Sequence, residues 1–375
     1  MDKLLKLKDF VFDFPNHLIA QTPLVERDQS KLIVRYFDGK ISHKNFFDLA
    51  SIFKNGGLFV FNDSRVIPSR LIAKQHLQYD QNDQTKRKGI EVFLLEKQGD
   101  TWLAIGKPMK KLHPGLEIDF DNQIKGIVIS KDVEKDTPTV KIKFNIDNQE
   151  FYSWIEKNGY IPLPPYIKRP DPVSAEKSKD KYCYQTLYAK DIGSTAAPTA
   201  GFHFSKKVLS DLKTAKVESA FVTLHVGGGT FLPVRSKDLV NHKMHEESYY
   251  VPKETIEQII KAKRDKKPIV AIGTTSFRAI ESMFLSCNGC FEKMLELSGQ
   301  WHRTGLFVYP KKKKERYNSS IFDAIITNFH QPESTLLMLI CALIGFDETK
   351  ELYKEAVSEN YRLFSYGDSS LLWLK

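Results

Sequence analysis

The chain has 375 residues, 41% of them hydrophobic with 25 Phe and 15 Tyr, which is enough apolar material for a large core and excludes wholesale disorder. Its formal net charge of +10 favours polyanionic partners, nucleic acid before others. The four scattered cysteines do not form a disulfide framework, and no apolar run approaches the ~20 residues that span a bilayer, so we expect a cytoplasmic protein without membrane contact.

The first clear element is a buried strand at Leu58–Phe61, which runs into a polar turn at 62–65. From about residue 71 to 148 the pattern changes to short alternating segments, such as 89–95 and 139–144, separated by Gly and Asp turns. Short antiparallel strands without a convincing helix predict a small antiparallel β-barrel. The length suggests two domains. We therefore expect residues 70–149 to form a barrel inserted into a main domain made of residues 1–69 and 150–375.

The residues after the predicted insertion have the pattern of an α/β domain. Three prolines between Ile161 and Ile167 impose an extended path, and the polar segment Pro170–Lys181 is expected to be a mobile loop. Strands are then predicted at 217–226, 268–273 and 321–327, and helices at 252–265, 333–344 and 347–361. This alternation predicts a mixed α/β fold for the main domain.

Small residues and hydroxyls fill the segment from Gly193 to Phe204, which ends in a histidine between two aromatic rings. Small side chains let a backbone approach a ligand closely, and hydroxyls can bond ribose or carboxylate groups. His203 can move a proton near neutral pH. The binding candidates of this segment are Thr195, Ala197, Thr199 and Gly201. The competing interpretation is a tightly packed loop with a satisfied core histidine.

A second segment places a histidine and three glycines at the end of the predicted strand 217–226. His225 precedes a turn that can cradle a ligand, and the candidates in this turn are Gly227, Gly228, Gly229 and Thr230. The pattern G-x-G-x-x-G is absent, so this turn is not a dinucleotide fingerprint.

Two further segments have the composition of binding sites. Thr274 and Thr275 lie where a predicted strand turns into a helix, and the free N–H groups of such a turn suit an anion, such as the carboxylate of a methionine moiety. An ordinary capped helix start is the alternative. Basic groups beside aromatic rings suit phosphates and unstacked bases, which gives the RNA-binding candidates Tyr166, Lys168 and Arg169.

Taken in chain order, these segments resemble the S-adenosylmethionine:tRNA ribosyltransferase-isomerase family of queuosine biosynthesis. The resemblance covers nearly the whole chain and rests on blocks at residues 12–14, 18–23, 27–28, 61–68, 162–167, 196–204, 225–231, 273–275, 327–330 and 361–368. The chain departs from the family at Gln331, where Leu is usual, at 310–312, where Pro-Gly-Tyr is usual, and mildly at Ser64, where Thr is usual.

The resemblance implies an α/β main domain with an inserted β-barrel and a reaction that consumes S-adenosylmethionine. The acceptor would be 7-aminomethyl-7-deazaguanine at the wobble position of tRNAs for Tyr, His, Asp and Asn, and the products would be epoxyqueuosine in tRNA, adenine and methionine. No metal and no stable protein partner is inferred. With this chemistry in view, the proton-transfer candidates are His203, His225, His245 and Asp63. Further substrate-binding candidates are Asn62, Arg65, Asn328 and His330.

Two hypotheses from other classes stay open. A catalytically silent RNA-binding protein on the same scaffold would bind tRNA with a salt-dependent affinity and leave S-adenosylmethionine intact. A metallohydrolase would use His203, His242 and His245, because a catalytic zinc site needs three convergent ligands.

Overall fold

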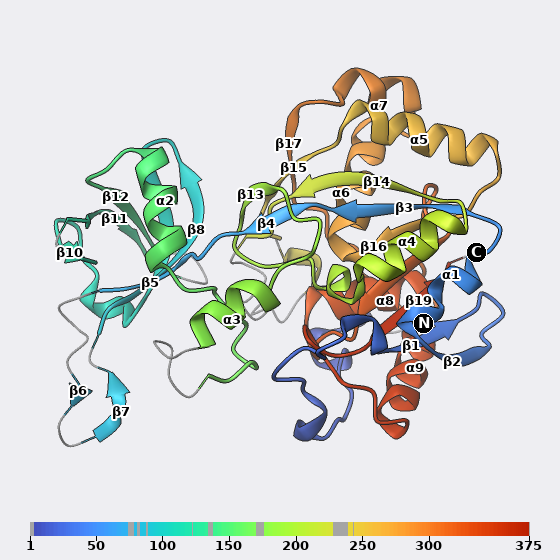
Figure 1. Ribbon diagram of the computed structural model, residues 1–375, viewed down its shortest axis with the longest axis horizontal. Helices are drawn as coiled ribbons and strands as arrows, with labels where there is room; N and C mark the ends of the chain where they lie inside the picture. Colours follow the sequence, from blue (N-terminus) through green and yellow to red (C-terminus); the bar gives the residue numbers. More distant parts are fainter. Residues whose placement is uncertain are drawn as a thin grey trace.

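The computed structural model describes residues 4–73, 79–80, 83–87, 89–121, 123–133, 138–169, 176–227, 239–242 and 244–374. Within these residues, nine strands form the main sheet in the order β17-β15-β14-β3-β16-β18-β19-β1-β2 (Figure 1). Their bounds in this order are Trp301–Thr304, Glu247–Tyr250, Val217–Leu224, Gly57–Asn62, Ile269–Ile272, Ala324–Asn328, Ser369–Trp373, Lys31–Arg35 and Ile41–Asn45. The four central strands β14, β3, β16 and β18 run parallel to one another.

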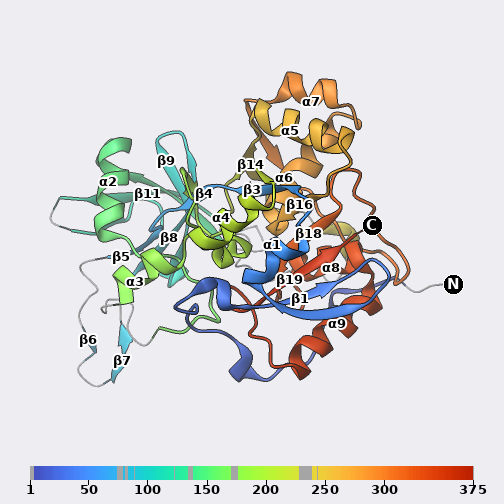
Figure 2. The ribbon, with the colours of Figure 1, turned by 45° about the vertical axis from the view of Figure 1, so that its right-hand side comes forward.

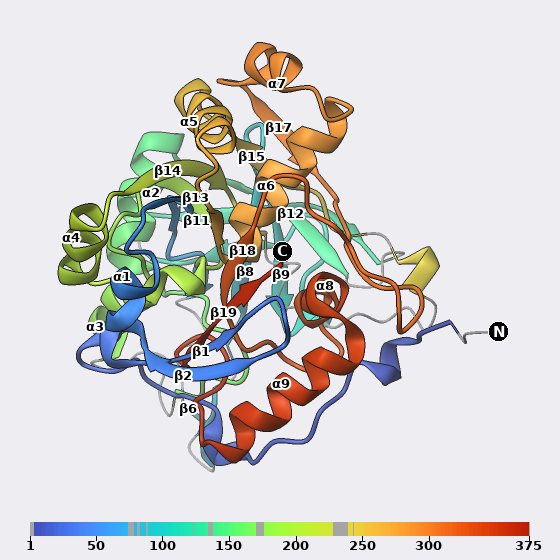
Figure 3. The ribbon, with the colours of Figure 1, turned by 90° about the vertical axis from the view of Figure 1, so that its right-hand side faces the viewer.

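Helices cover both faces of the main sheet. The helices on one face are α5 (Lys253–Arg264), α6 (Gly273–Ser286), α8 (Thr335–Ile344) and α9 (Phe346–Ser358), and those on the other are α1 (Leu49–Ile52) and α4 (Lys206–Thr214). Figure 3 shows α1 and α4 to the left of the central strands and α6 and α8 to the right. Because successive side chains of a strand point to opposite faces, Leu58 and Val60 of β3 pack into the first layer and Phe59 and Phe61 into the second.

The helix starts follow from local sequence. Ser205 caps α4 by accepting a hydrogen bond from the Val208 N–H at 3.1 Å, and Ser334 caps α8 in the same way with Leu337 at 3.2 Å. Every residue of α8 from Leu337 to Ile344 is buried, so the predicted helix 333–344 is confirmed as a core helix. No helix in the described part of the chain is long and apolar enough to cross a membrane.

A second sheet is wholly antiparallel and lies beside the main domain (Figure 2). Its order is β10-β11-β12-β9-β8-β5, with bounds Glu117–Asp119, Lys125–Asp132, Thr139–Phe144, Thr101–Lys107, Glu91–Gln98 and Arg70–Ile72. Phe151 and Ile155 of α2 (Asn148–Asn158) complete its core. The mixed α/β class with a second antiparallel sheet is thus confirmed. In the described residues no ladder joins β10 to β5, whose outer side is bridged at Arg70 to Tyr160, so the sheet is curled and open rather than a closed barrel.

One predicted element is wrong in part. The segment 170–181 was expected to be a loop, yet Glu176–Cys183 forms helix α3, while residues 170–175 lie outside the described residues. Polar composition alone favours a loop, but a tertiary contact decides here: Asp180 is buried and receives the Arg169 guanidinium.

The predicted strands at 217–226, 268–273 and 321–327 and the helices at 252–265 and 347–361 are confirmed with shifts of a few residues at their ends.

Candidate active site

Four parallel strands end at the same edge of the main sheet. β14, β3, β16 and β18 are consecutive neighbours, and the carboxyl edge of such strands is where α/β folds bind ligands. The predicted candidates at this edge are Asp63 after β3, His225 after β14, Thr274 and Thr275 after β16, and Asn328 at the end of β18.

The segment 194–204 runs along this edge and joins the strand ends. At one end the Thr195 N–H donates to the Val226 carbonyl at 2.9 Å. In the middle, a Cβ built on Gly273 would meet the Ala200 methyl at 3.4 Å. At the other end His203 contacts Asn328 at 3.2 Å. The structure therefore brings together 196–204, 225–227 and 273–275, whereas Gly228, Gly229 and Thr230 lie outside the described residues.

His225 has the environment of a proton acceptor. Its Nδ1 lies 2.8 Å from the Ser64 hydroxyl, and its ring stacks on Trp301 with centroids 5.0 Å apart. Gly193 lies against Nε2, where a Cβ would come within 2.7 Å, and in the described part of the chain Nε2 has no hydrogen-bond partner. Burial lowers the pKa of His225 to about 4, so the imidazole is neutral near pH 7. In the tautomer whose Nδ1–H donates to the Ser64 hydroxyl, Nε2 carries the free lone pair and can accept a proton.

Asp63, by contrast with His225, has the environment of a proton donor. Its Oδ1 accepts a hydrogen bond from the Thr223 hydroxyl at 2.7 Å, and the same hydroxyl lies 3.5 Å from Asp191 Oδ2. Burial raises the pKa of Asp63, and the negative charge of Asp191 raises it further. The carboxyl therefore holds a proton more readily than an exposed aspartate does, which suits a general acid.

His203 is held at both ring nitrogens. Asn328 donates from Nδ2 to the Phe364 carbonyl at 3.1 Å, which turns the amide nitrogen toward His203 and makes Nε2 the acceptor. Nδ1–H then donates to the Ser30 hydroxyl at 2.7 Å, and the ring stacks on Phe46. Burial lowers the pKa of His203 to about 3. In this arrangement its neutral ring orients the loop, and its predicted part in proton transfer stays a prediction.

Several predicted binding side chains hold the site together. The Asn62 amide donates to the Leu224 carbonyl at 3.0 Å and accepts from the backbone of Ser64 and Leu224. The Thr195 hydroxyl donates to Val226 O at 3.0 Å. Gly201 leaves room for Tyr188, whose hydroxyl oxygen would lie 2.1 Å from a Cβ at this position. These three residues therefore position the loop in the structure.

The remaining candidates divide by exposure. Ala197 is buried and Thr199 is half-buried in the turn Thr199–His203. The Thr275 hydroxyl in the first turn of α6 is buried and has no partner in the described residues. His330 lies 2.8 Å from the Thr327 hydroxyl through Nε2, and burial lowers its pKa to about 3.

Two candidates lie at the surface. His245 is exposed, and Arg65 is exposed with its guanidinium 3.6 Å from Glu156. Neither side chain meets the strand-end groups described above, so their predicted roles stay predictions.

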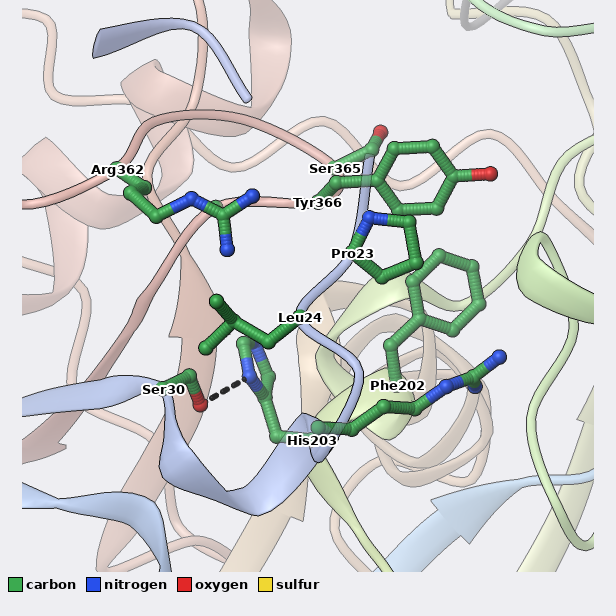
Figure 4. Close-up of a pocket in the computed structure, with 10 residues that line it drawn as sticks. Pro23, Leu24, Ser30, Phe202, His203, Arg362, Ser365 and Tyr366 are labelled. Carbon is green, nitrogen blue, oxygen red and sulfur yellow. Dashed lines mark hydrogen bonds between the residues drawn. The ribbon is translucent and has the colours of Figure 1, made fainter. Parts of the chain in front are cut away.

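A small recess opens beside His203 (Figure 4). Its polar lining consists of Arg27, Ser30, His203, Arg362, Ser365 and Tyr366. Arg27 and Arg362 were not among the predicted site residues, although the resemblance blocks 27–28 and 361–368 include them. Only these resemblance blocks could have identified the two arginines from the sequence, since neither lies in a local pattern typical of a binding site.

A buried ion pair adjoins the glycine turn and was missed by sequence reasoning. Arg278 of α6 donates to Glu247 of β15, and both side chains are almost fully buried. Glu247 also accepts a hydrogen bond from the Gly227 N–H at 3.3 Å. The pair therefore fixes the start of the turn that follows His225.

The RNA-binding candidates differ in availability. Lys168 is exposed, and the Tyr166 hydroxyl bonds the Ser365 hydroxyl at 2.6 Å. The Arg169 guanidinium is engaged by Asp180, with Nη2 to Oδ1 at 2.7 Å and Nε to Oδ2 at 3.0 Å. A phosphate would have to compete with that carboxylate for Arg169.

We expect Arg169→Ala to lower the free energy of unfolding by about 3 kcal/mol, because removal of one partner leaves the other charge buried. Both side chains are only 12% and 11% exposed. Lys168→Ala, the matched control, should change it by less than ~0.5 kcal/mol. Urea unfolding at pH 7 measures both. An Arg169→Ala protein that unfolds like the wild type would contradict the structural role.

In the described residues, no three His, Cys, Asp or Glu side chains come together in a metal-binding group. His203 contacts Ser30 and Asn328, while His242 packs edge-on against Phe307. The three histidines of the metallohydrolase hypothesis therefore do not form one site.

Comparison with known proteins places these features in a family. The chain matches the family model described as "Queuosine biosynthesis protein" over residues 7–372. It is 41% identical to the S-adenosylmethionine:tRNA ribosyltransferase-isomerase of Rickettsia bellii (strain OSU 85-389), covering 99% of this chain and 100% of that protein. The protein of the same name from Clostridioides difficile (strain 630) is 42% identical, over 98% and 100%. A crystal structure of the S-adenosylmethionine tRNA ribosyltransferase from Thermotoga maritima is similar with a TM-score of 0.50 and 29% identity, over 97% and 99%.

Proposed function

Because the chain belongs to the queuosine biosynthesis protein family, we propose that it is an S-adenosylmethionine:tRNA ribosyltransferase-isomerase. It transfers and isomerises the ribosyl group of S-adenosylmethionine onto 7-aminomethyl-7-deazaguanine at the tRNA wobble position. The products are epoxyqueuosine in tRNA, adenine and methionine. The structural observation that carries this function is the meeting of His225, Asp63 and the segment 194–204 at one edge of the sheet.

The reaction requires proton transfer in a site that excludes water. A sulfonium acidifies the adjacent 5′ carbon of the ribose, so a positioned base can remove a proton there and adenine can leave. The RNA amine then attacks, the ribose hydroxyls close the epoxide, and methionine leaves. The protein supplies a base, an acid and orientation.

The strand-end residues suit these roles unequally. His225 is our choice for the base, since its ring is neutral and its Nε2 is not engaged in the described residues. Asp63 is our choice for the acid, since burial favours its protonated form. Thr274 and Thr275 are proposed to contact the methionine carboxylate of the substrate, because free backbone N–H groups at a helix start suit an anionic group. Gly227 is proposed as a substrate contact from its place two residues after His225.

The proposal also covers the tRNA acceptors, the cellular location, the cofactor requirement and the extent of the inserted domain. The acceptors are the tRNAs for Tyr, His, Asp and Asn, and the net charge of +10 suits such a polyanion. The enzyme works in the cytoplasm without a metal or a stable protein partner. The inserted domain is proposed to span residues 70–149, and α2, whose Phe151 and Ile155 pack on the second sheet, follows it.

The test is a reaction of purified protein with S-adenosylmethionine and tRNA that carries the aminomethyl base. We expect stoichiometric release of adenine and methionine and a new epoxide-bearing nucleoside by mass spectrometry. The same tRNA with an unmodified guanine at the wobble position is the control and should give no product. If folded protein yields none of the three products from the modified tRNA, the proposed function is wrong.

A further inference from the structure

Trp301 is an exposed tryptophan in contact with the proposed catalytic base His225. It lies in β17 at one edge of the main sheet, and its indole stacks on the imidazole with centroids 5.0 Å apart and planes tilted by 24°. Although the imidazole covers part of the indole, 53% of Trp301 is exposed, whereas Trp102 is buried and Trp154 and Trp373 are half-buried. Burial of an indole is normally favourable, so its exposure beside a catalytic candidate points to a ligand that covers it.

The strand register shows which groups share the face of the sheet that carries this indole. Trp301 lies opposite Tyr250 of β15, which lies opposite Thr223 of β14. Residues directly opposite in an antiparallel pair point to the same face, and the Tyr250 ring contacts the indole with centroids 5.6 Å apart. The Thr223 hydroxyl donates to Asp63, the proposed acid. The exposed part of Trp301 therefore lies at the end of a row of side chains that leads to the proton-transfer groups.

Arg303 indicates what kind of group this surface accepts. It lies two residues after Trp301 and thus on the same face of β17, where it donates to Glu96 of β8 at 2.6 Å and to Glu246 at 2.9 Å. Since β8 belongs to the antiparallel sheet, the indole lies where the main domain and the second sheet meet. Two carboxylates already engage the guanidinium, so this surface offers an aromatic face rather than a free cation. That composition favours a flat ring over a phosphate.

We propose that Trp301 is the stacking platform for a purine-type base of a substrate, an inference that rests on the proposed function. Each substrate carries such a ring, namely the adenine of S-adenosylmethionine and the 7-deazaguanine at the tRNA wobble position. One stacked base strengthens binding roughly 5- to 150-fold. Because His225 stacks on the same indole, a base on Trp301 keeps its attached ribose or aminomethyl arm close to the imidazole.

Two substitutions of Trp301 separate stacking from packing when each substrate is titrated alone. We expect Trp301→Leu to weaken the binding of S-adenosylmethionine or of tRNA bearing the aminomethyl base about tenfold. Trp301→Phe keeps an aromatic face, so its affinities should stay within about threefold of the wild type. The substrate whose affinity falls identifies the stacked ring. Phe47→Leu is the matched control and should leave both affinities unaltered, because Phe47 is 43% exposed and follows β2 at the opposite edge of the sheet.

Tryptophan fluorescence provides a second measurement. A base that stacks on an exposed indole quenches its emission, so the emission of the wild type should fall when the stacking substrate binds. The fall should be absent in Trp301→Phe, since the other three tryptophans are buried or half-buried. This comparison keeps the test decisive if Trp301→Leu does not fold.

Three results would overturn the inference. The first is unchanged affinity for both substrates in Trp301→Leu, which would leave the indole only a packing partner of His225, whether or not kcat falls. The second is an equal loss of affinity in the leucine and phenylalanine variants, and the third is wild-type emission that neither substrate changes. Adenine release by the wild type is measured in parallel, so failure of the proposed function is seen separately from failure of the stacking contact.

Discussion

Replacing His225 with glutamine is expected to lower kcat by about 10²- to 10⁴-fold and to change tRNA affinity less than about threefold. Glutamine keeps a polar group within reach of Ser64 but cannot take up a proton. The loss falls on turnover because Nε2 of His225 faces Gly193 at the sheet edge and has no protein partner in the described residues. Single-turnover release of adenine measures the effect.

The matched control is His302→Gln in the neighbouring strand β17. His302 is half-buried, and its ring bonds the Leu297 carbonyl at 2.8 Å away from the strand-end residues, so its loss should leave kcat near the wild-type value. Since burial lowers the pKa of His225 to about 4, the base is already deprotonated at pH 6, and kcat should not fall through protonation of His225 between pH 8 and 6. Equal losses of kcat and tRNA affinity would instead assign His225 to packing against Trp301.

The free energy of unfolding should fall steeply as the pH drops below 6.5, because three imidazoles, one buried and two half-buried, are held in neutral form. Burial lowers the pKa of His203 and His330 to about 3 and that of His225 to about 4. A folded-state pKa below the unfolded value of about 6.5 means that the unfolded chain binds more protons, so the stability present above pH 6.5 is lost on acidification. Each imidazole accounts for about 1.6 kcal/mol between pH 6.5 and 5, or roughly 5 kcal/mol for the three.

Two buried carboxyls act in the opposite direction. Burial raises the pKa of Asp63 and Asp368, so the cost of burying their charges falls as they take up protons in acid. They offset part of the loss of stability as they take up protons, so the net fall is smaller than the imidazoles alone would give.

Urea unfolding at pH 7, 6 and 5 measures the pH dependence of stability. His330→Gln should remove about one third of that dependence, whereas His245→Gln, at an exposed position, should leave it unchanged. A free energy of unfolding that stays constant from pH 7 to pH 5 would contradict burial of the three neutral rings.

The sequence alone determined the elements whose signals are local. The apolar run at 336–346 predicted a buried helix, and α8 is buried along its whole second part. The run Leu58–Phe61 predicted the central strand β3 and the polar turn that carries Asp63. Such patterns repeat every two to four residues and therefore need no knowledge of distant partners. The blocks that resemble the family pointed to the same strand-end segments that the fold brings together.

Only the tertiary structure decided which of these residues have free polar atoms. His203 and His225 are equally plausible bases in sequence, but the fold satisfies both nitrogens of His203 through Ser30 and Asn328 and leaves His225 Nε2 open in the described residues. In the same way it engages Arg169 with Asp180 while Arg362 keeps an unused donor. Ser30 and Asn328 lie 173 and 125 positions from His203, and no local period encodes which pairs meet in the folded chain. Composition and spacing therefore supply the candidate groups, and long-range packing assigns their protonation and their availability to a substrate.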